Sequence, residues 1–154
     1  MNNLKKGFTL IELLVVIGII GILAAIVLIA VNPGRQFAQA RDTQRLSDLR
    51  AITDAIYQYA AEHNGDLPDT DDDDTTSNFP ASLTEIGTAG FDLASANSEA
   101  DPTTTVVPTY IADIPQDPST GDAANTGYYI YQNSDGRLVA SATGELQASI
   151  SVER

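Results

Sequence analysis

The residues with the most distinctive chemistry lie near the start of the chain, where residues 5–12 read Lys-Lys-Gly-Phe-Thr-Leu-Ile-Glu. Glu12 is a carboxylate placed immediately before nineteen uncharged residues, Leu13–Val31. A charged side chain costs about 2.5–3.5 kcal/mol at the centre of a membrane-spanning helix, and less near the membrane surface. Glu12 therefore needs either a local role at a helix start or a positively charged partner.

Two roles for Glu12 are compatible with its neighbours. Thr9 and Glu12 match the S/T-x-x-E capping box, in which the two side chains bind backbone N–H groups at the start of a helix. The positive end of the helix dipole would also favour a carboxylate there. Alternatively, Glu12 pairs with a cation that another chain supplies in apolar surroundings. The spacing alone leaves both roles open.

These residues resemble the processing signature of type IV prepilins and type II secretion pseudopilins. The shared pattern is a basic leader, a glycine before an aromatic residue, and a glutamate five positions after that glycine. The resemblance implies that a membrane prepilin peptidase cleaves between Gly7 and Phe8, and that Phe8 is then N-methylated. It also implies that Glu12 pairs with the Phe8 amine of a neighbouring subunit in a filament, assembled by an ATPase and an inner-membrane platform protein.

The apolar segment Phe8–Val31 is long enough to cross a membrane. At about 1.5 Å per helical residue it spans roughly 36 Å, whereas a hydrocarbon core is about 30 Å thick. The apolar region of a secretory signal is shorter, about 7–15 residues, so we interpret the segment as a retained single-pass helix. Lys and Arg are nearly balanced across it, so only the resemblance places the N-terminus in the cytoplasm. It implies an inner-membrane protein before assembly and an extracellular or periplasmic filament afterwards.

The sequence divides into four regions. We expect a leader at 1–7, a transmembrane and filament-core helix at 8–31, an amphipathic continuation at 32–65, and a globular pilin-like head at 66–154. The Asn-Pro-Gly sequence at residues 32–34 predicts a kink or break.

The amphipathic continuation has one apolar stripe at helical spacing. The charged residues of the same helix are expected to form a solvated face, or to pair with acidic patches of adjacent subunits. The stripe comprises Leu46, Leu49, Ile52, Ile56 and Tyr59, and the charged residues are Arg41, Asp42, Arg45 and Asp48.

The head is predicted to mix short helices with strands. Tyr128–Gln132, Arg137–Ala142 and Glu145–Val152 have strand patterns, and the last alternates apolar and polar residues. Ala81–Thr88 is expected to form a short helix with Leu83 and Ile86 inward, and Pro108–Ile114 a turn of helix. The expected fold class is therefore α+β, with a long N-terminal helix kinked near Pro33 that packs on a small antiparallel three-stranded sheet.

A second pattern resembles the heads of major pseudopilins and similar bacterial pilins. It consists of Tyr110-Ile111-x-x-Ile114-Pro115-x-Asp117-Pro118 followed by Gly127-Tyr128-Tyr129. Major pseudopilins also have an acidic calcium-binding segment near the C-terminus. Residues 136–154 contain only two acidic residues, Glu145 and Glu153, so we do not expect that calcium site in this chain.

Composition excludes several classes of function. The chain has no cysteine, so a disulfide framework and thiolate metal sites are excluded. Residues 51–154 contain two basic and eighteen acidic residues, which disfavours direct binding of nucleic acid. The acidic loop at Asp69 and Asp71–Asp74 lacks EF-hand spacing, and Asp117 with Asp122 offers only a weak calcium alternative. We expect no metal, no cofactor and no enzymatic activity, because no catalytic constellation is present and His63 is the only histidine.

The sequence therefore predicts a structural subunit of a type IV pilus or pseudopilus that polymerises with copies of itself or in a mixed filament. A pseudopilin of a type II secretion or DNA-uptake machine is the alternative. A membrane-tethered binding domain that never polymerises is the second alternative. The sequence does not separate a long pilus from a short pseudopilus, or a major from a minor subunit.

Overall fold

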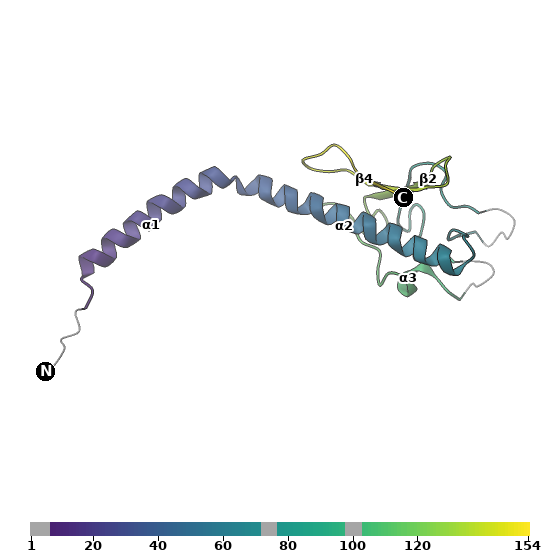
Figure 1. Cartoon of the computed structure of the whole chain (residues 1–154), viewed down its shortest axis with the longest axis horizontal. Coiled ribbons are helices and arrows are strands. Elements are labelled where there is room, and N and C mark those ends of the chain that lie inside the picture. The colour runs from purple at the N-terminus through teal and green to yellow at the C-terminus, as the bar shows by residue number, and fades with distance from the viewer. Residues whose placement is uncertain (1–6, 72–76, 98–102) are drawn as a thin grey trace. The chain divides into compact units, whose positions relative to one another are not determined.

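The computed structural model describes residues 7–71, 77–97 and 103–154, and the chain divides into two compact units between Phe37 and Ala38. The first unit contains helix α1, Leu10–Val31, which is shown as an unbroken coil in Figure 1. None of the α1 residues is buried. In the described part of the chain, α1 is the one helix long and apolar enough to cross a membrane.

A single residue separates α1 from helix α2, Pro33–Glu62, and this confirms the predicted break. Asn32 has a left-handed backbone with φ 46° and ψ 78°, a conformation that asparagine tolerates better than most residues. Its carbonyl oxygen accepts hydrogen bonds from the N–H groups of Arg35 and Gln36. Pro33 is suited to the first helical position, because it has no N–H to leave unpaired there.

The second unit, residues 38–154, is the head together with most of α2. The predicted apolar stripe is confirmed, since Leu49, Ile52, Ile56 and Tyr59 are fully buried and Leu46 is partly buried against them. After α2 the backbone turns through left-handed conformations at Asn64 and Gly65, and the Gly65 N–H donates to the Ala60 carbonyl at 2.8 Å. This arrangement ends the helix as the His-Asn-Gly sequence predicts.

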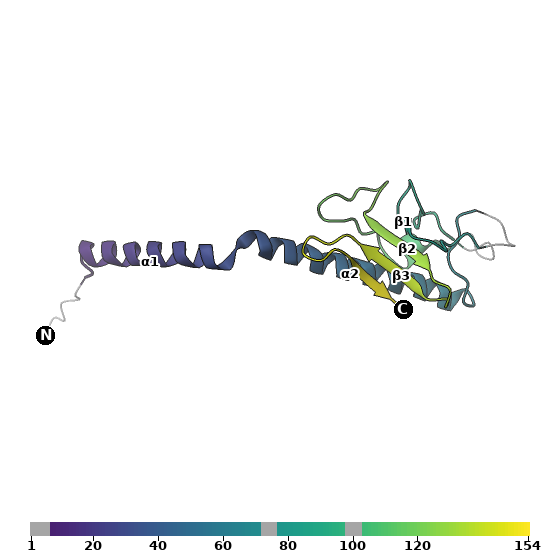
Figure 2. The same ribbon diagram turned by 90° about the horizontal axis from the view of Figure 1, so that it is seen from above.

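The sheet has four antiparallel strands in the order β1-β2-β3-β4, rather than the three predicted (Figure 2). The prediction of β2 was correct, and β3 begins one residue later than predicted. The strands are β1 Thr84–Glu85, β2 Tyr128–Gln132, β3 Leu138–Ala142 and β4 Ile150–Glu153.

The extra strand lies in the segment that was predicted to be a helix, 81–88. Thr84 and Glu85 pair with Ile130 and Tyr129 of β2, and the N–H of Ile86 donates to the carbonyl of Tyr128 at 2.8 Å. Strand pairing therefore overrides the local helical pattern. Ile86 is buried as predicted, but Leu83 is 59% exposed rather than inward.

Two other predicted boundaries were wrong. β4 begins at Ile150, five residues later than the strand predicted at 145–152, and it ends at Glu153. The N–H groups of Glu145 and Leu146 donate to the carboxylate of Asp42 instead of a neighbouring strand. Helix α3 is Val106–Thr109 rather than 108–114. Pro115 disfavours a helical backbone at the residue before it, which limits helix formation towards that end.

One core joins the sheet, α2 and the intervening loops. Tyr59, Tyr128 and Ile130 are among its fully buried side chains, and Phe79 meets Phe91 edge to face with ring centroids 5.2 Å apart. The acidic run at 72–74 lies outside the described residues. The buried cluster consists of Leu49, Ile52, Ala55, Ile56, Tyr59, Phe79, Ile86, Phe91, Leu93, Ala96, Val106, Tyr128, Ile130, Leu138, Ala140, Ala142 and Ile150.

A matched pair of leucines tests the strand at 84–85. Leu93 is fully buried, so Leu93→Ala should lower the free energy of unfolding by about 2–5 kcal/mol. Leu83 faces outward, so Leu83→Ala should change it by less than about 0.5 kcal/mol. Urea unfolding of the full chain in detergent, followed by near-ultraviolet circular dichroism, measures both. A comparable loss for Leu83→Ala would instead support an inward-facing helix at 81–88.

Candidate functional site

The N-terminal candidate site is the segment from Phe8 to Glu12. Thr9 is the N-cap of α1, and its Oγ1 accepts a hydrogen bond from the Glu12 N–H at 3.3 Å. Glu12 Oε2 in turn accepts from the Thr9 N–H at 2.9 Å and from the Thr9 hydroxyl at 2.8 Å. The capping box predicted from the sequence is therefore present in the single chain, and the Glu12 carboxylate has a local role.

The helix that follows presents apolar surface on every side. Phe8 is 87% exposed, and the large apolar side chains of α1 are all at least half exposed. A Cβ added at Gly18 or Gly21 would meet no atom within 4 Å, so both glycines leave open surface. A helix this apolar is stable only where lipid or other helices cover it.

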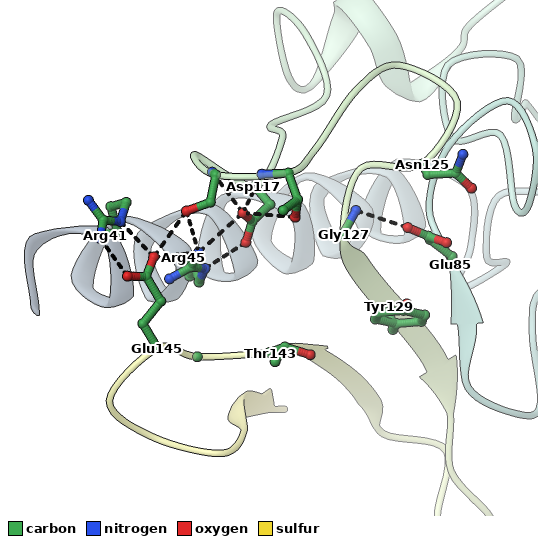
Figure 3. A pocket seen from close by; sticks show the side chains of 12 residues that line it. Arg41, Arg45, Glu85, Asp117, Asn125, Gly127, Tyr129, Thr143 and Glu145 are labelled. Atoms are coloured by element: carbon green, nitrogen blue, oxygen red, sulfur yellow. Dashed lines mark hydrogen bonds and ion pairs between the residues drawn. The ribbon is translucent and has the colours of Figure 1, made fainter. Parts of the chain in front are cut away.

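A second candidate site is a cluster of ion pairs at the edge of the head, which we call the Arg45 cluster. It comprises Arg41, Asp42, Arg45, Asp117 and Glu145, of which Figure 3 labels all but Asp42. Arg45 lies at its centre and is only 2% exposed. Its Nε donates to Asp117 Oδ2 at 2.6 Å, Nη1 to Asp42 Oδ1 at 2.8 Å, and Nη2 to Glu145 Oε1 at 3.1 Å.

The cluster anchors two loops to α2. Asp117 also accepts hydrogen bonds from the N–H groups of Ser119 and Thr120, at 2.8 and 3.1 Å, which fixes the loop before β2. Asp42 accepts from the N–H groups of Glu145 and Leu146, at 2.8 and 2.9 Å, which fixes the loop between β3 and β4.

The cluster stabilises its carboxylates in the charged form. The hydrogen bond from Arg45 lowers the pKa of Asp117 to about 2, against the opposing effect of burial. The hydrogen bond from Arg41 lowers the pKa of Glu145 to about 2. Burial would raise the pKa of Asp42, but the two backbone N–H groups and Arg45 outweigh it and the pKa is lowered.

A tyrosine of the sheet is bound to the same helix. The Tyr128 hydroxyl donates to Asp48 Oδ2 at 2.7 Å, and Gln44 donates to the other oxygen of that carboxylate. Burial, together with the hydrogen bond to Asp48, raises the pKa of Tyr128. The hydroxyl is therefore a stable donor at neutral pH.

The packing around Asp117 explains part of the second sequence pattern. Gly127 has φ +77°, and a Cβ at that position would lie 2.8 Å from the Cβ of Asp117. Only glycine allows the chain to pass this close before it enters β2. Asp117 and the Gly127-Tyr128 pair of that pattern therefore meet in space.

The prediction that the charges of α2 form a solvated face was wrong for Asp42, Arg45 and Asp48, which are all buried. Helical spacing located them on one side of α2 but did not show that two loops cover that side. The signal that sequence reasoning missed was an Asp in a segment bounded by two prolines, Pro115 and Pro118, in a chain without cysteine.

The other candidate residues have structural contacts. Asp117 is bound to Arg45, and Asp122 accepts from the N–H groups of Ala124 and Asn125 within a turn. Among the described residues no three acidic or histidine side chains are grouped as metal ligands. His63 stacks on Tyr59 with ring centroids 4.0 Å apart, at the end of α2.

These features define a class of protein: a subunit with one capped apolar helix, a break, and a small α+β head. Comparisons with known proteins identify it further. Residues 2–28 match the family described as "Prokaryotic N-terminal methylation motif". The chain is therefore similar, over its N-terminal part, to type IV pilins.

Three relatives illustrate the similarity. A fimbrial protein of Neisseria meningitidis serogroup A is 41% identical over 86 residues, which cover 56% of this chain and 46% of that protein. A type IV major pilin protein PilE1 of Neisseria gonorrhoeae is 43% identical over 63 residues, 41% of this chain and 37% of that protein. A type IV major fimbrial protein FimA of Dichelobacter nodosus is 50% identical over 48 residues, 31% of this chain and 30% of that protein.

The chain spans less than half the length of each of these relatives. No solved structure shows a significant match to it.

The lowered pKa of Asp117 predicts how stability depends on pH. Because its pKa is about 2 in the folded chain and 3.8 ordinarily, its contribution is present above about pH 4 and is lost as pH falls towards 2. The shift corresponds to about 2 kcal/mol. Asp117→Asn should therefore destabilise the head at neutral pH, by about 3 kcal/mol once the weakened Arg45 pairing is included.

Urea unfolding of the two chains at about pH 6 and about pH 2.5 measures this effect. The difference between wild type and Asp117→Asn should shrink by roughly 2 kcal/mol at the lower pH. Asp135→Asn, in the exposed turn between β2 and β3, is the matched control and should change stability by less than about 0.5 kcal/mol. A difference that does not depend on pH would contradict the ion pair.

Proposed function

We propose that this chain is a structural subunit of a type IV pilus, made as a membrane-anchored prepilin and polymerised into a helical filament. The observation that supports this most directly is α1, a helix of 22 residues without a buried side chain, in the segment that matches the methylation motif. Such a helix first requires lipid around it. It can exchange lipid for the helices of other subunits without exposing apolar surface to water.

The proposed processing would create a positively charged partner for Glu12, which in the described residues is hydrogen-bonded only to the neutral Thr9. Cleavage after Gly7 by a prepilin peptidase would release the Phe8 amine, and N-methylation would leave that amine able to carry a proton. A terminal amine has an ordinary pKa of about 7.7–8.0, so it is mostly positive at neutral pH. In an apolar filament core, this amine and a neighbouring Glu12 would compensate for each other's loss of water.

The capping box gives the carboxylate a partner before assembly. The hydroxyl and the N–H group of Thr9 donate to the Glu12 carboxylate at 2.8 and 2.9 Å. The carboxylate would therefore be hydrogen-bonded while the subunit is still a monomer in the membrane. Assembly would then replace or supplement these neutral donors with a cation, which adds an attraction between opposite charges.

The remaining parts of the proposal rest on the similarity to type IV pilins. The N-terminus would lie in the cytoplasm, the head would lie outside the inner membrane, and an assembly ATPase with a platform protein would drive polymerisation. A pseudopilin of a type II secretion or DNA-uptake machine is the alternative, favoured by the pattern from Tyr110 to Tyr129. The head has no assigned catalytic role.

The first prediction of this proposal concerns processing. Co-expression with a prepilin peptidase should remove residues 1–7 and add one methyl group to Phe8. The variant Gly7→Val should keep its full mass, because a branched side chain blocks the small site before the cleaved bond. Intact-mass spectrometry of the purified chains measures both. An unchanged wild-type mass with a peptidase that cleaves a known prepilin would contradict the assignment.

The second prediction separates the charge of Glu12 from its capping role. Gln can replace Glu in a capping box, so Glu12→Gln keeps the cap but loses the negative charge. It should reduce incorporation into filaments by more than about 100-fold, because an unpaired buried charge costs about 3–5 kcal/mol. Thr9→Val removes the cap and keeps the carboxylate, so it should still assemble.

Quantification of sheared surface filaments in a pilus-competent host measures incorporation, with the membrane-bound pool of each variant as the control for expression. Normal assembly of Glu12→Gln would rule out pairing with the Phe8 amine. Loss of assembly in Thr9→Val alone would show that the capping box is the essential feature.

A further inference from the structure

The head contains an open cleft that the proposed polymerisation does not use. It has a volume of about 530 Å³, which is within the range of small-ligand sites. One side is formed by the Arg45 cluster and the loop at 119–120, and the other by the outward face of the sheet (Figure 3). The cleft lies wholly within the unit 38–154.

The charged groups on the first side of the cleft are already paired with one another. The guanidinium of Arg45 contacts Asp117 and Glu145, and Arg41 contacts both oxygens of Glu145. An anionic ligand would have to displace a carboxylate from Arg41 or Arg45, and the Glu85 carboxylate opposite would repel it. The charges of the cleft therefore disfavour an anionic ligand.

The second side of the cleft offers an aromatic ring surrounded by polar groups. Tyr129 is partly exposed on β2 and is flanked by Glu85 of β1. Glu85 uses one oxygen to accept from the Gly127 N–H at 3.0 Å, which leaves its other oxygen available. The cleft is also lined by Asn125 and Thr143. Within the described part of the chain, no hydrogen bond is formed by the side chains of these two residues or by the Tyr129 hydroxyl.

We propose that this cleft binds a neutral carbohydrate, as a short segment of a glycan. A sugar ring has one face of C–H groups that can pack on the Tyr129 ring, and hydroxyl groups around its edge. The Asn125 amide can both donate to and accept from such hydroxyls, the Thr143 hydroxyl can do the same, and the Glu85 carboxylate can accept. An aromatic ring with a few converging polar groups is the pattern of an orienting small-molecule site.

This inference does not depend on polymerisation, because every residue of the cleft belongs to the head. A monomer in detergent can therefore be tested. The detergent should be zwitterionic, since alkyl glucosides and maltosides have sugar headgroups that would compete. The neutral probes are lactose, maltotetraose and cellotetraose, and the charged probe is sialyllactose.

Saturation-transfer NMR of the full chain should detect at least one neutral probe with a Kd on the order of 1 mM, weak because the cleft is open. Sialyllactose should bind less well than lactose. Tyr129→Ala should weaken binding at least about fivefold, whereas Tyr129→Phe keeps the ring and should retain most of it. Tyr131→Ala is the matched control, because Tyr131 lies two residues further along the same face of β2 and does not line the cleft.

Three outcomes would overturn the proposal. Absence of saturation transfer from every neutral probe at about ten times the expected Kd would exclude a carbohydrate of this size. An equal loss of affinity for the neutral probes in Tyr129→Ala and Tyr131→Ala would show that the sugar does not bind in the cleft. Loss of filaments in Tyr129→Ala, with no sugar binding by the wild type, would assign the cleft to a contact between subunits.

Discussion

The structure of the head depends on one buried cation. Arg45 binds carboxylates from three separate parts of the chain, and its partners Asp117 and Glu145 lie 72 and 100 residues further along the sequence. A buried charge is tolerated only while its partners stay in place, so this residue fixes the positions of both loops rather than merely adding stability. In a chain without cysteine, these contacts tie the C-terminal region to α2, as disulfides tie together small secreted domains.

The sequence predicts the parts of this fold that local patterns determine. The apolar stripe from Leu49 to Tyr59, the strand at Tyr128–Gln132 and the break at Asn32 were all visible in spacing or residue type. What it did not predict depends on distant pairing. β1 forms because β2 offers it a partner, and the segment before Ile150 is not a strand because Asp42 binds its N–H groups. The Arg45 cluster was missed for the same reason.

The two compact units differ in what stabilises them. The head has its own apolar core and pairs its buried arginine with carboxylates of its own. α1 has no buried residue and only Glu12 as a charge, so its stability depends on what covers it. The proposed processing after Gly7 would change the charge at the start of α1 without altering the head.

The break at Asn32 has a mechanical consequence. None of the α2 residues before Ala38 is buried, so the residues between the break and the head are held by helical hydrogen bonds alone. A tensile load along the chain would therefore unwind this short stretch before it disturbed the apolar core. A helical residue advances the chain by about 1.5 Å and an extended one by about 3.3 Å, so each residue that unwinds adds roughly 2 Å of length. The chain thus contains an extensible link between α1 and the apolar core of the head.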